Sequence, residues 1–480
     1  MQLANFIGGR YSPPENGQYL PNIEPATGQV YGEIPDSDHR DIETAVAAAQ
    51  AAVPLWSKMP AAERSKILFR VADLLEDRLE DFAVAESKDQ GKPLSLARSV
   101  DVPRAVANFR FFAGAILHDQ TQAMDMDGKA LNYVHRSPVG IAGLISPWNL
   151  PIYLLTWKMA PALAAGNCII AKPSELTSAT AHMLGALLNE AGLPPGAANL
   201  VLGAGFNAGA ALVRHPKVPL ISFTGGPKTA VNIQTDAAPF FKKLGLELGG
   251  KNPTIIFGDA DLDKAVPGAL RAAFANQGEI CLCGSRLLVE ETVYDRVLEA
   301  MVAGAARIQV GDPMLPTTDM GALVSAAHRD KVAGYCALAQ EEGGQLHCGG
   351  GIPELPDRCR EGFFLEPTIF SGLDPGCRVM QEEIFGPVLT ITPFKTEEEA
   401  IAIANGTAYG LSASIWTQNL KRAHSVAQNL EAGVIWVNTW LMRDLRTPFG
   451  GMKASGVGRV GGQFSLNFFS ETRNICIAME

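Results

Sequence analysis

Two short tracts of the sequence combine a thiol with a carboxylate in glycine-rich surroundings. One is FANQGEIC, residues 274–281, which ends at Cys281, and the other is ELGGKN, residues 247–252, which begins at Glu247. A cysteine thiolate can add to an electrophilic carbon, and a carboxylate can act as the general base of a later step. The neighbouring glycines leave the backbone free to admit a carbonyl substrate and to let the carboxylate change position. Together the tracts predict a thiol nucleophile with a carboxylate base, although either one alone is more often a packing element.

Cys283 lies close to the predicted nucleophile, and we interpret it as a packing or redox bystander. The pair Cys281-x-Cys283 has the spacing of half a metal site, but no second cysteine pair or nearby histidine completes the ligand set. We therefore expect no bound metal. The cysteines lack the regular spacing of a disulfide framework and are expected to be reduced thiols. They occupy positions 168, 281, 283, 336, 348, 359, 377 and 476.

Length and composition restrict the class of protein. A chain of 480 residues with 47% hydrophobic residues, 48 glycines and 31 prolines is expected to form a loop-rich α/β protein with more than one domain. The net charge of −10, without a local cluster of Lys and Arg, argues against a nucleic-acid partner. Residues 1–6 lack the basic start of a secretion signal, and the most apolar stretch, residues 152–171, contains Lys158 and Pro161, which are costly in a bilayer. We expect a soluble cytoplasmic protein with no membrane partner.

Two types of periodicity divide the chain. Apolar residues recur at three- and four-residue steps over residues 41–53, 61–87 and 99–118, which predicts an outer layer of long helices. Short apolar runs then alternate with helical segments, which predicts parallel sheets in two α/β lobes with ligands at the carboxyl ends of the strands. The predicted strands of the first lobe are residues 141–145, 168–171, 199–202, 220–223 and 244–248, and those of the second are residues 253–257, 286–289, 412–416 and 434–437.

A hairpin is predicted between the helical layer and the first sheet. Residues 123–136 read as two extended arms joined by a tight turn at Asp127-Gly128. Such a hairpin cannot bury both of its faces alone. We expect it to form a subunit-joining sheet with residues 474–478 of a homodimer or homotetramer; the alternative is a hairpin folded over its own domain.

Three tracts bear on a nucleotide cofactor. Residues 203–208, GAGFNA, fit the loose dinucleotide pattern G-x-G-x-x-G/A, but the acidic residue expected about twenty positions later is missing, so we assign no standard phosphate loop there. In IAKPSE, residues 170–175, Lys172 and Glu175 could bind the hydroxyls of a ribose. In SFTGG, residues 222–226, the glycines could open a helix start to a pyrophosphate. Each tract alone is more often an ordinary turn or loop.

The sequence resembles the aldehyde dehydrogenase superfamily over nearly its whole length. The tracts that carry the resemblance occur in the superfamily's order and are PWNLP at 147–151, KPSE at 172–175, FTG at 223–225, ELGGK at 247–251, GEIC at 278–281, EEIFGP at 382–387 and PFGG at 448–451. The resemblance implies two Rossmann-like α/β lobes with a small oligomerisation unit of a β-hairpin and a strand. It divides the chain into an NAD-binding domain at 1–119 and 139–248, a catalytic domain at 249–462, and oligomerisation elements at 120–138 and 463–480.

The same resemblance implies a role for individual residues. Cys281 is the nucleophile, Glu247 the general base of thioester hydrolysis, and Asn149 a donor to the oxyanion. The cofactor is NAD, because a carboxylate at Glu175 would repel the additional phosphate of NADP. The residues expected to bind the cofactor are Trp148, Lys172, Glu175, Phe223, Gly225, Gly226, Glu383 and Phe385.

Arginines offer the best indication of the substrate. Arg104 lies in a predicted helix, and Arg443 and Arg446 lie just before the PFGG tract; in the superfamily both regions face the aldehyde entrance. Guanidinium groups there would bind a carboxylate, which implies an anionic semialdehyde. The alternative is that these arginines form surface ion pairs with Asp101 and Asp444.

Tracts within residues 145–158, 274–283 and 440–446 are similar to the branch of the superfamily that oxidises 2-aminomuconic 6-semialdehyde, with the 2-hydroxymuconic branch next. Betaine aldehyde and succinic semialdehyde are further candidate substrates. A CoA-acylating enzyme is disfavoured because Glu247 is retained for hydrolysis. A catalytically silent binding protein would be expected to lose one of the chemical residues, and Asn149, Glu247 and Cys281 are all present.

Overall fold

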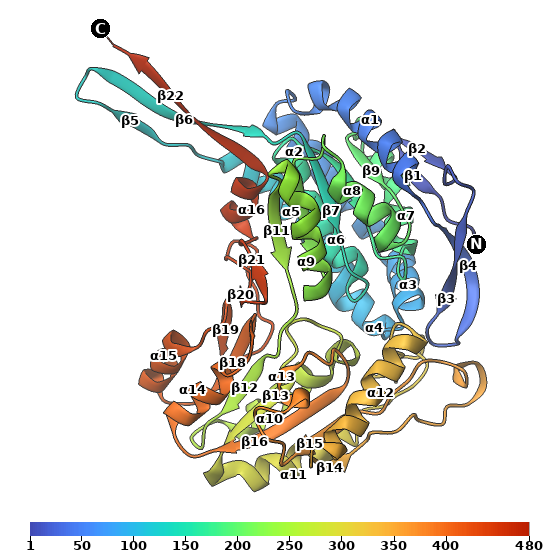
Figure 1. Cartoon of the computed structure of the whole chain (residues 1–480), viewed down its shortest axis with the longest axis vertical. Helices are drawn as coiled ribbons and strands as arrows, with labels where there is room; N and C mark the ends of the chain where they lie inside the picture. The colour runs from blue at the N-terminus through green and yellow to red at the C-terminus, as the bar shows by residue number, and fades with distance from the viewer. Residues whose placement is uncertain (480) are drawn as a thin grey trace.

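The first lobe is built on a large, mostly parallel sheet. A computed structural model describes residues 1–479 and shows two lobes with a projecting arm (Figure 1). The eight-stranded sheet has the order β2-β1-β9-β8-β7-β10-β11-β21. Its strands are β1 Asn5–Ile7, β2 Arg10–Ser12, β7 Ile141–Ile145, β8 Cys168–Lys172, β9 Ala198–Leu200, β10 Leu220–Thr224, β11 Lys243–Glu247 and β21 Gly456–Val457.

The central strands β7 to β11 of this sheet pair in parallel, and all five were predicted from continuous apolar runs. Every residue of β7 and β8 is buried, because helices cover both faces. The main helices of this lobe are α1 His39–Trp56, α2 Ala61–Asp77, α3 Leu79–Gln90, α5 Val102–Ala115, α6 Pro151–Ala164, α7 Ala179–Glu190, α8 Ala210–Arg214 and α9 Pro227–Ala237.

The predicted helical layer is present, but two of its helices are interrupted. The helix expected over residues 61–87 is divided at Arg78, which has φ −109° and ψ 22° and belongs to neither α2 nor α3. The helix expected over residues 99–118 begins two residues earlier as a π-helix, η1 Ala97–Asp101, and continues as α5. Apolar spacing alone does not reveal such changes, because the buried face continues across both of them.

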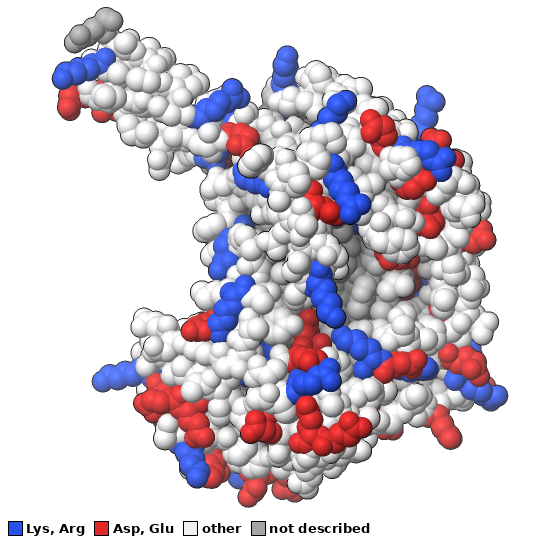
Figure 2. Space-filling model, in the orientation of Figure 1, with Lys and Arg blue, Asp and Glu red and all other residues white. Residues whose placement is uncertain are grey.

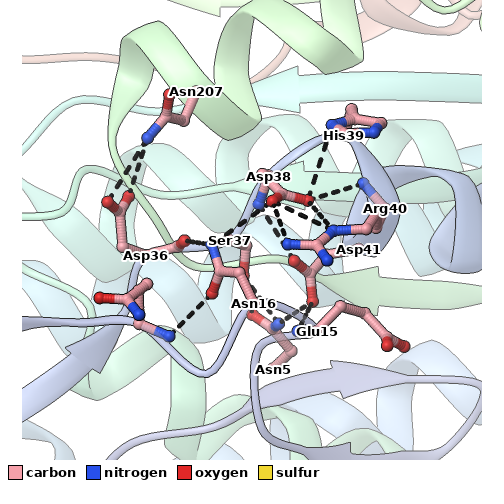
Figure 3. A network of polar contacts seen from close by, with 11 residues as sticks. Asn5, Glu15, Asn16, Asp36, Ser37, Asp38, His39, Arg40, Asp41 and Asn207 are labelled. Atoms are coloured by element: carbon pink, nitrogen blue, oxygen red, sulfur yellow. Dashed lines mark hydrogen bonds and ion pairs between the residues drawn. The ribbon is translucent and has the colours of Figure 1, made fainter.

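A polar network fixes the N-terminal strands to α1 (Figure 3). Asp38 and Asp41 form a capping box at the start of α1. The Asp41 carboxylate also accepts hydrogen bonds from the Asn5 side chain, at 3.1 Å, and from the backbone of Glu15, at 3.0 Å. Asp36 accepts from the Asn207 side chain in η3 Gly205–Gly209. The network therefore holds the η3 segment, which contributes to a cavity described below.

The second lobe carries a seven-stranded sheet of order β14-β15-β16-β13-β12-β18-β19, parallel except for β14. Sequence patterns predicted β12, β13, β18 and β19 but not the other three strands. On the face shown in Figure 2, Asp and Glu gather over this lobe. Its strands are β12 Pro253–Ile256, β13 Arg286–Glu290, β14 Gln345–Cys348, β15 Thr368–Ser371, β16 Val388–Phe394, β18 Ser412–Trp416 and β19 Val434–Val437. Its main helices are α10 Leu262–Phe274, α11 Tyr294–Ala305, α12 Ala326–Glu341, α14 Glu397–Asn405 and α15 Leu420–Asn429.

The arm is a three-stranded sheet of order β22-β6-β5 that extends away from both lobes (Figure 1). β5 Ala123–Asp125 and β6 Ala130–Pro138 form the predicted hairpin, and Asp127 and Gly128 have φ of 53° and 74° in its turn. β22 Ser470–Ala478 pairs with β6 along its whole length. The hairpin is therefore not folded over its own domain. Within residues 1–479, no helix combines the length and apolar character required to cross a bilayer.

Candidate active site

The three predicted chemical residues follow three secondary-structure elements that end near one another. Glu247 is the last residue of β11, and Asn149 precedes α6, which begins with a proline suited to a first helical turn. Cys281 follows α10 after a tight turn in which Asn276 and Gln277 have φ of 51° and 57°. The turn reverses the chain and presents the thiol at the junction of the two lobes.

Cys281 lies where two cavities meet. We call them the polar cavity, with a volume of about 300 Å³, and the aromatic cavity, with a volume of about 70 Å³. Leu154, Thr224, Leu248 and Cys281 line both. The polar cavity is also lined by Trp148, Asn149, Gly225, Gly226, His328, Lys331, Glu383 and Phe385. The aromatic cavity is also lined by Asp101, Tyr153, Trp157, Glu247, Arg271, Trp440, Arg443 and Phe449.

The surroundings of the Cys281 thiol favour its protonated form. Burial raises the pKa of Cys281 to about 12, and the nearby Arg443 guanidinium only partly opposes this effect. Burial also raises the pKa of Cys283, which is 6% exposed and lines neither cavity. The Asn252 side chain donates to the backbone carbonyls of Cys281 and Cys283, at 2.7 and 2.9 Å, and so holds the loop in place. Of the two thiols, only Cys281 is open to a ligand.

Glu247 has the properties of a base. Its side chain is 7% exposed, and among the described residues its Oε2 atom has no hydrogen-bond partner. Burial raises the pKa of Glu247 to about 8, against the opposing influence of Lys158, Arg443 and Arg459. Lys158 in α6 donates to the Ser222 hydroxyl at 3.1 Å. A carboxylate with a pKa close to neutrality and a free oxygen can accept a proton from water.

Asn149 is held at both its backbone and its side chain. Its Nδ2 donates to the backbone carbonyl of Glu279 at 2.8 Å, which turns the amide toward the loop that carries Cys281. Its own carbonyl accepts from Lys92 Nζ at 3.0 Å and from Asn276 Nδ2 at 3.1 Å. The amide has a second N–H that can be directed to a ligand oxygen.

The glycines of the two chemical tracts serve close packing rather than the looseness expected from the sequence. A Cβ at Gly249 would lie 2.0 Å from Glu383 Oε2, and the backbone N–H of Gly250 donates to Glu383 Oε1 at 3.0 Å. Gly278 has φ +71°, and a Cβ there would lie 2.2 Å from the Gly386 carbonyl. The ELGG and GEIC tracts thus form a surface against which the EEIFGP tract packs.

An aromatic cluster closes the polar cavity. The Trp148 and Phe385 rings are 5.3 Å apart and nearly perpendicular, and the His328 ring is 5.0 Å from Trp148. His328 Nε2 lies 2.7 Å from the Phe385 carbonyl, at a residue whose φ is 62°. His328 and Lys331, on one face of α12, were missed by sequence reasoning because nothing local distinguishes them from other polar helix residues.

A third cavity, of about 560 Å³, lies between η3 and α9 and is lined in part by Phe223, Gly205 and Thr229. Beside it, Lys172 Nζ forms an ion pair with Glu175 Oε2 at 2.9 Å. Burial would raise the pKa of Glu175, but Lys172 outweighs it and the pKa is lowered, so the carboxylate is charged.

The residues present fit an extended nucleotide. A Cβ added at Gly226 would meet nothing within 4 Å, so the start of α9 is open. Gly226 at this helix start lines the polar cavity, Thr229 in the first turn of α9 lines the third cavity, and a helix N-terminus favours phosphate. Of the expected cofactor-binding residues, Trp148, Gly225, Gly226, Glu383 and Phe385 line the polar cavity, Phe223 lines the third cavity, and Lys172 and Glu175 form the ion pair beside it.

The three predicted arginines occupy different environments. Arg443 lines the aromatic cavity, 4.0 Å above the Phe449 ring, and is 3.4 Å from the Tyr153 hydroxyl. Arg104 packs behind that wall, 5.3 Å from the Tyr153 ring, and its Nε and Nη2 atoms are buried without partners among residues 1–479. Arg446 lies outside the cavity with a side chain 79% exposed and paired with Asp444.

Sequence reasoning missed most of the aromatic cavity. Tyr153 and Trp157 are one turn apart on α6, a spacing that could have revealed a shared face. Trp440 donates from Nε1 to the Leu282 carbonyl at 3.0 Å, and Arg271 lies 5.8 Å from its ring. These residues come from distant parts of the chain.

Comparisons with known proteins agree with this geometry. A sequence profile described as the aldehyde dehydrogenase family matches residues 11–475. The 2-aminomuconic semialdehyde dehydrogenase of Homo sapiens is 52% identical over 480 residues, covering 99% of this chain and 98% of that protein. The 2-hydroxymuconic semialdehyde dehydrogenase of Pseudomonas sp. strain CF600 is 46% identical over 484 residues, covering 100% of both.

The fold is also matched. The crystal structure of PnpE, from Pseudomonas sp. WBC-3, in complex with nicotinamide adenine dinucleotide has a TM-score of 0.98 and 41% identity and covers 100% of this chain and 98% of that one. The fold class expected from the sequence is confirmed by this likeness. The profile match and the similarity over the whole chain show that this enzyme belongs to the aldehyde dehydrogenase family.

Proposed function

We propose that the protein oxidises an anionic semialdehyde with NAD, and that the substrate is 2-aminomuconate 6-semialdehyde, which yields 2-aminomuconate. The observation that carries the substrate class is the pair of arginines at the aromatic cavity. Arg104 has buried, unpartnered nitrogens, and Arg443 lies close enough to lower the pKa of Arg104 in addition to the larger effect of burial. Two neighbouring cations, one of them with unpartnered nitrogens, favour an anionic ligand.

The carbon chemistry can be assigned to the chain's own residues. Once deprotonated, Cys281 Sγ adds to the aldehyde carbon, so that a C–S bond forms and negative charge develops on the former carbonyl oxygen. The Asn149 amide and the Cys281 backbone N–H are the donors assigned to that oxygen. Loss of a hydride, which is one proton with two electrons, from this carbon leaves a thioester on Cys281.

Hydrolysis then restores the enzyme. Glu247 takes one proton from water as the water oxygen attacks the thioester carbon. The C–S bond then breaks, and the proton held by Glu247 passes to the departing sulfur, which releases the carboxylic acid and restores the Cys281 thiol. The raised pKa of Glu247 suits this step. It makes the carboxylate a stronger base than an ordinary glutamate, while part of the enzyme still has this carboxylate ionised near neutral pH. The free Oε2 of Glu247 leaves one oxygen available for the water.

NAD, when bound, would accept the hydride from the carbon joined to Cys281. We assign Lys172 and Glu175 to the adenosine ribose, Glu383 to the nicotinamide ribose, and Trp148 and Phe385 to the walls of the cleft. Phe223, Gly225 and Gly226 flank the open start of α9, where a pyrophosphate would lie. Support comes from the two cavities lined on either side of the α9 start and from the PnpE complex, whose structure is similar over the whole chain.

The muconic skeleton fits the walls of the aromatic cavity. A flat, unsaturated acid can stack against aromatic rings, and Tyr153, Trp157, Trp440 and Phe449 provide them. Relatives with 2-aminomuconic and 2-hydroxymuconic names are 52% and 46% identical to this chain. The 2-hydroxymuconic semialdehyde is the second candidate, because its relatives are nearly as similar.

A panel of turnover rates tests the proposed function. The purified enzyme is assayed with 2-aminomuconic, 2-hydroxymuconic and succinic semialdehydes and with betaine aldehyde, each with NAD and with NADP. We expect the highest kcat/KM with 2-aminomuconic semialdehyde and NAD. A preference for the cationic betaine aldehyde would contradict the substrate class, and a preference for the hydroxy compound would change only the named substrate.

We further propose that the arm joins subunits of a homodimer or homotetramer. Most side chains of β22 are exposed, including Ile477 at 47%, and Met124 on β5 is 45% exposed. Apolar side chains on an isolated three-stranded sheet favour contact with another subunit. Deletion of residues 470–480 should lower the number of subunits in the assembly, as measured by analytical ultracentrifugation. An unchanged number of subunits would contradict this role.

A further inference from the structure

A fully buried lysine lies beneath the active site and has no part in the chemistry above. Lys92 follows α3 and is 0% exposed. Its ammonium group donates to Asp101 Oδ2 at 2.7 Å and to the backbone carbonyl of Asn149 at 3.0 Å. Asp101 is also 0% exposed, so the pair is completely removed from water. A buried ion pair contributes little net stability compared with apolar packing, so stability alone does not explain its presence.

Gln90, two residues earlier, holds the loop of the nucleophile. Its Nε2 donates at 2.7 Å to a carboxyl oxygen of Glu279, which is 0% exposed. The backbone carbonyl of the same Glu279 accepts the hydrogen bond from the Asn149 side chain at 2.8 Å. Asn149 and Glu279 are thus joined by a hydrogen bond, and each is also held by a second residue: Lys92 binds Asn149, and Gln90 binds Glu279.

The residue between them allows this arrangement. Gly91 has φ +94°, and a Cβ there would lie 2.6 Å from the Ala322 carbonyl. The Gly91 carbonyl in turn accepts from the Ala322 backbone at 3.0 Å. The left-handed turn and the close approach direct Gln90 and Lys92 to different loops while the turn itself is fixed to the second lobe.

We propose that Lys92 is a positioning residue: by holding the Asn149 carbonyl, it places the Asn149 side-chain amide to donate to the oxygen of the carbon bonded to Cys281, while Gln90 holds the cysteine loop at the matching distance. This inference rests on the proposed role of Asn149 as a donor to that oxygen. A displacement of a catalytic group by about 1 Å can cost roughly 10²-fold in rate. The contact thus affects the transition state more than substrate binding.

A double-mutant cycle tests the proposal. Lys92→Met should lower kcat roughly 10- to 100-fold and change KM little, because Asn149 would be displaced and not lost. In an Asn149→Ala background, which has no amide to position, adding Lys92→Met should change kcat by less than about threefold. Full additivity of the two losses would overturn the proposal, since a general structural defect would act in either background.

A second buried lysine supplies the matched control. Lys242 Nζ also donates to backbone carbonyls, including that of Val218 at 2.7 Å, but it lies before β11 and lines none of the active-site cavities. Lys242→Met should lower the melting temperature and leave kcat near that of the wild type. If Lys242→Met and Lys92→Met lower kcat equally, the specific role of Lys92 is refuted.

Variants that avoid an unpaired buried charge guard against misfolding. Lys92→Met combined with Asp101→Asn removes both charges, and Gln90→Leu removes none; each should show the same loss of kcat and the same non-additivity with Asn149→Ala. All assays use the aldehyde with the highest turnover, so the result does not depend on the named semialdehyde. If Asn149→Ala is fully active, the proposed function of Asn149 fails; if it is impaired and the turn variants are not, only this inference fails.

Discussion

The polar groups around the polar cavity are paired with one another, whereas several around the aromatic cavity have no partner. Glu383 accepts from the Gly250 backbone, His328 lies within hydrogen-bond distance of the Phe385 carbonyl, and Lys331 donates to the Ile384 carbonyl at 3.1 Å. Around the aromatic cavity, the unpartnered atoms of the described residues are Glu247 Oε2, Asp101 Oδ1, Trp157 Nε1, and Nε and Nη2 of Arg104.

This difference separates two kinds of recognition. Buried polar atoms are nearly always satisfied, so a group of unpartnered atoms around one cavity calls for a ligand or water. The paired side is preformed and suits a cofactor shared by a whole family, whereas the unpaired side suits a substrate that supplies the missing partners. Cys281 lies between them, and each prediction below tests one side or the boundary.

The largest effect is expected at Cys281, which lines both cavities. Cys281→Ser should lower turnover by more than about 10⁴-fold, because a serine hydroxyl without thiolate character cannot add to the aldehyde. Cys283→Ser should keep most of the activity, since that side chain lines neither cavity. Steady-state formation of NADH measures both variants. The reverse result would show that the thiol exposed to both cavities is not the nucleophile.

The next effect concerns the unpaired carboxylate. Glu247→Gln should slow turnover roughly 10²- to 10⁴-fold and let a thioester accumulate, because the amide cannot take a proton from water. Mass spectrometry of the peptide that contains Cys281 would detect the adduct. If Glu247→Gln forms neither product nor adduct in the first turnover, Glu247 is required for formation of the thioester and not only for its hydrolysis.

The same residue predicts a pH dependence. The base must be ionised, and burial raises the pKa of Glu247 to about 8, so hydrolysis should slow as the pH falls below about 8 and reach a plateau above it. Rates of deacylation measured from pH 6 to 9 provide the test. In Glu247→Gln the dependence should disappear; if it persists, another group is responsible.

A smaller effect is expected at the arginines of the aromatic cavity. Arg443→Met should lower kcat/KM for the semialdehyde roughly 10- to 100-fold, because a charge-assisted hydrogen bond is lost, and should have little effect on an uncharged aldehyde of similar size. Arg104→Met should have the same selectivity but a smaller effect, because Arg104 packs behind the wall of the cavity. Arg446→Met is the matched control, since Arg446 is exposed and paired with Asp444. Equal losses with both substrates would mean that the arginines support the wall of the cavity and not the substrate.

The parts of both cavities that lie in recognisable tracts could be predicted from the sequence, but His328 and Lys331 on the paired side and the aromatic walls of the unpaired side could not. Contiguous tracts such as ELGG and EEIFGP encode the polar cavity, since Glu383 and Gly250 each belong to one of them. Tyr153, Trp440 and Phe449 come from separate elements, and only the fold brings them together. A sequence motif shows which residues are neighbours in the chain, but it does not show which residues from distant parts of the chain lie close together in the fold.

The same limit applies to the elements themselves. The central strands of the first sheet are buried on both faces and are therefore continuous apolar runs, which made them predictable. β15 Thr368–Ser371 is also buried but has only two apolar residues, between a threonine and a serine, and was missed. Lys92 follows a helix in a polar turn, where a lysine is usually solvated, so its complete burial could not be inferred without the fold.

The smallest effect is expected at the ion pair beside the third cavity, and it tests whether Glu175 determines which cofactor is used. Glu175 forms an ion pair with Lys172, and its side chain is 34% exposed, so solvent weakens its repulsion of a phosphate. Glu175→Gln should raise kcat/KM for NADP about tenfold, because the negative charge is removed and the Lys172 ammonium becomes available to the phosphate. The rate with NAD should fall only slightly, since glutamine can still bond a ribose hydroxyl. If NADP use does not increase, the preference arises from the shape of the third cavity, and the Lys172–Glu175 ion pair beside it only holds the turn.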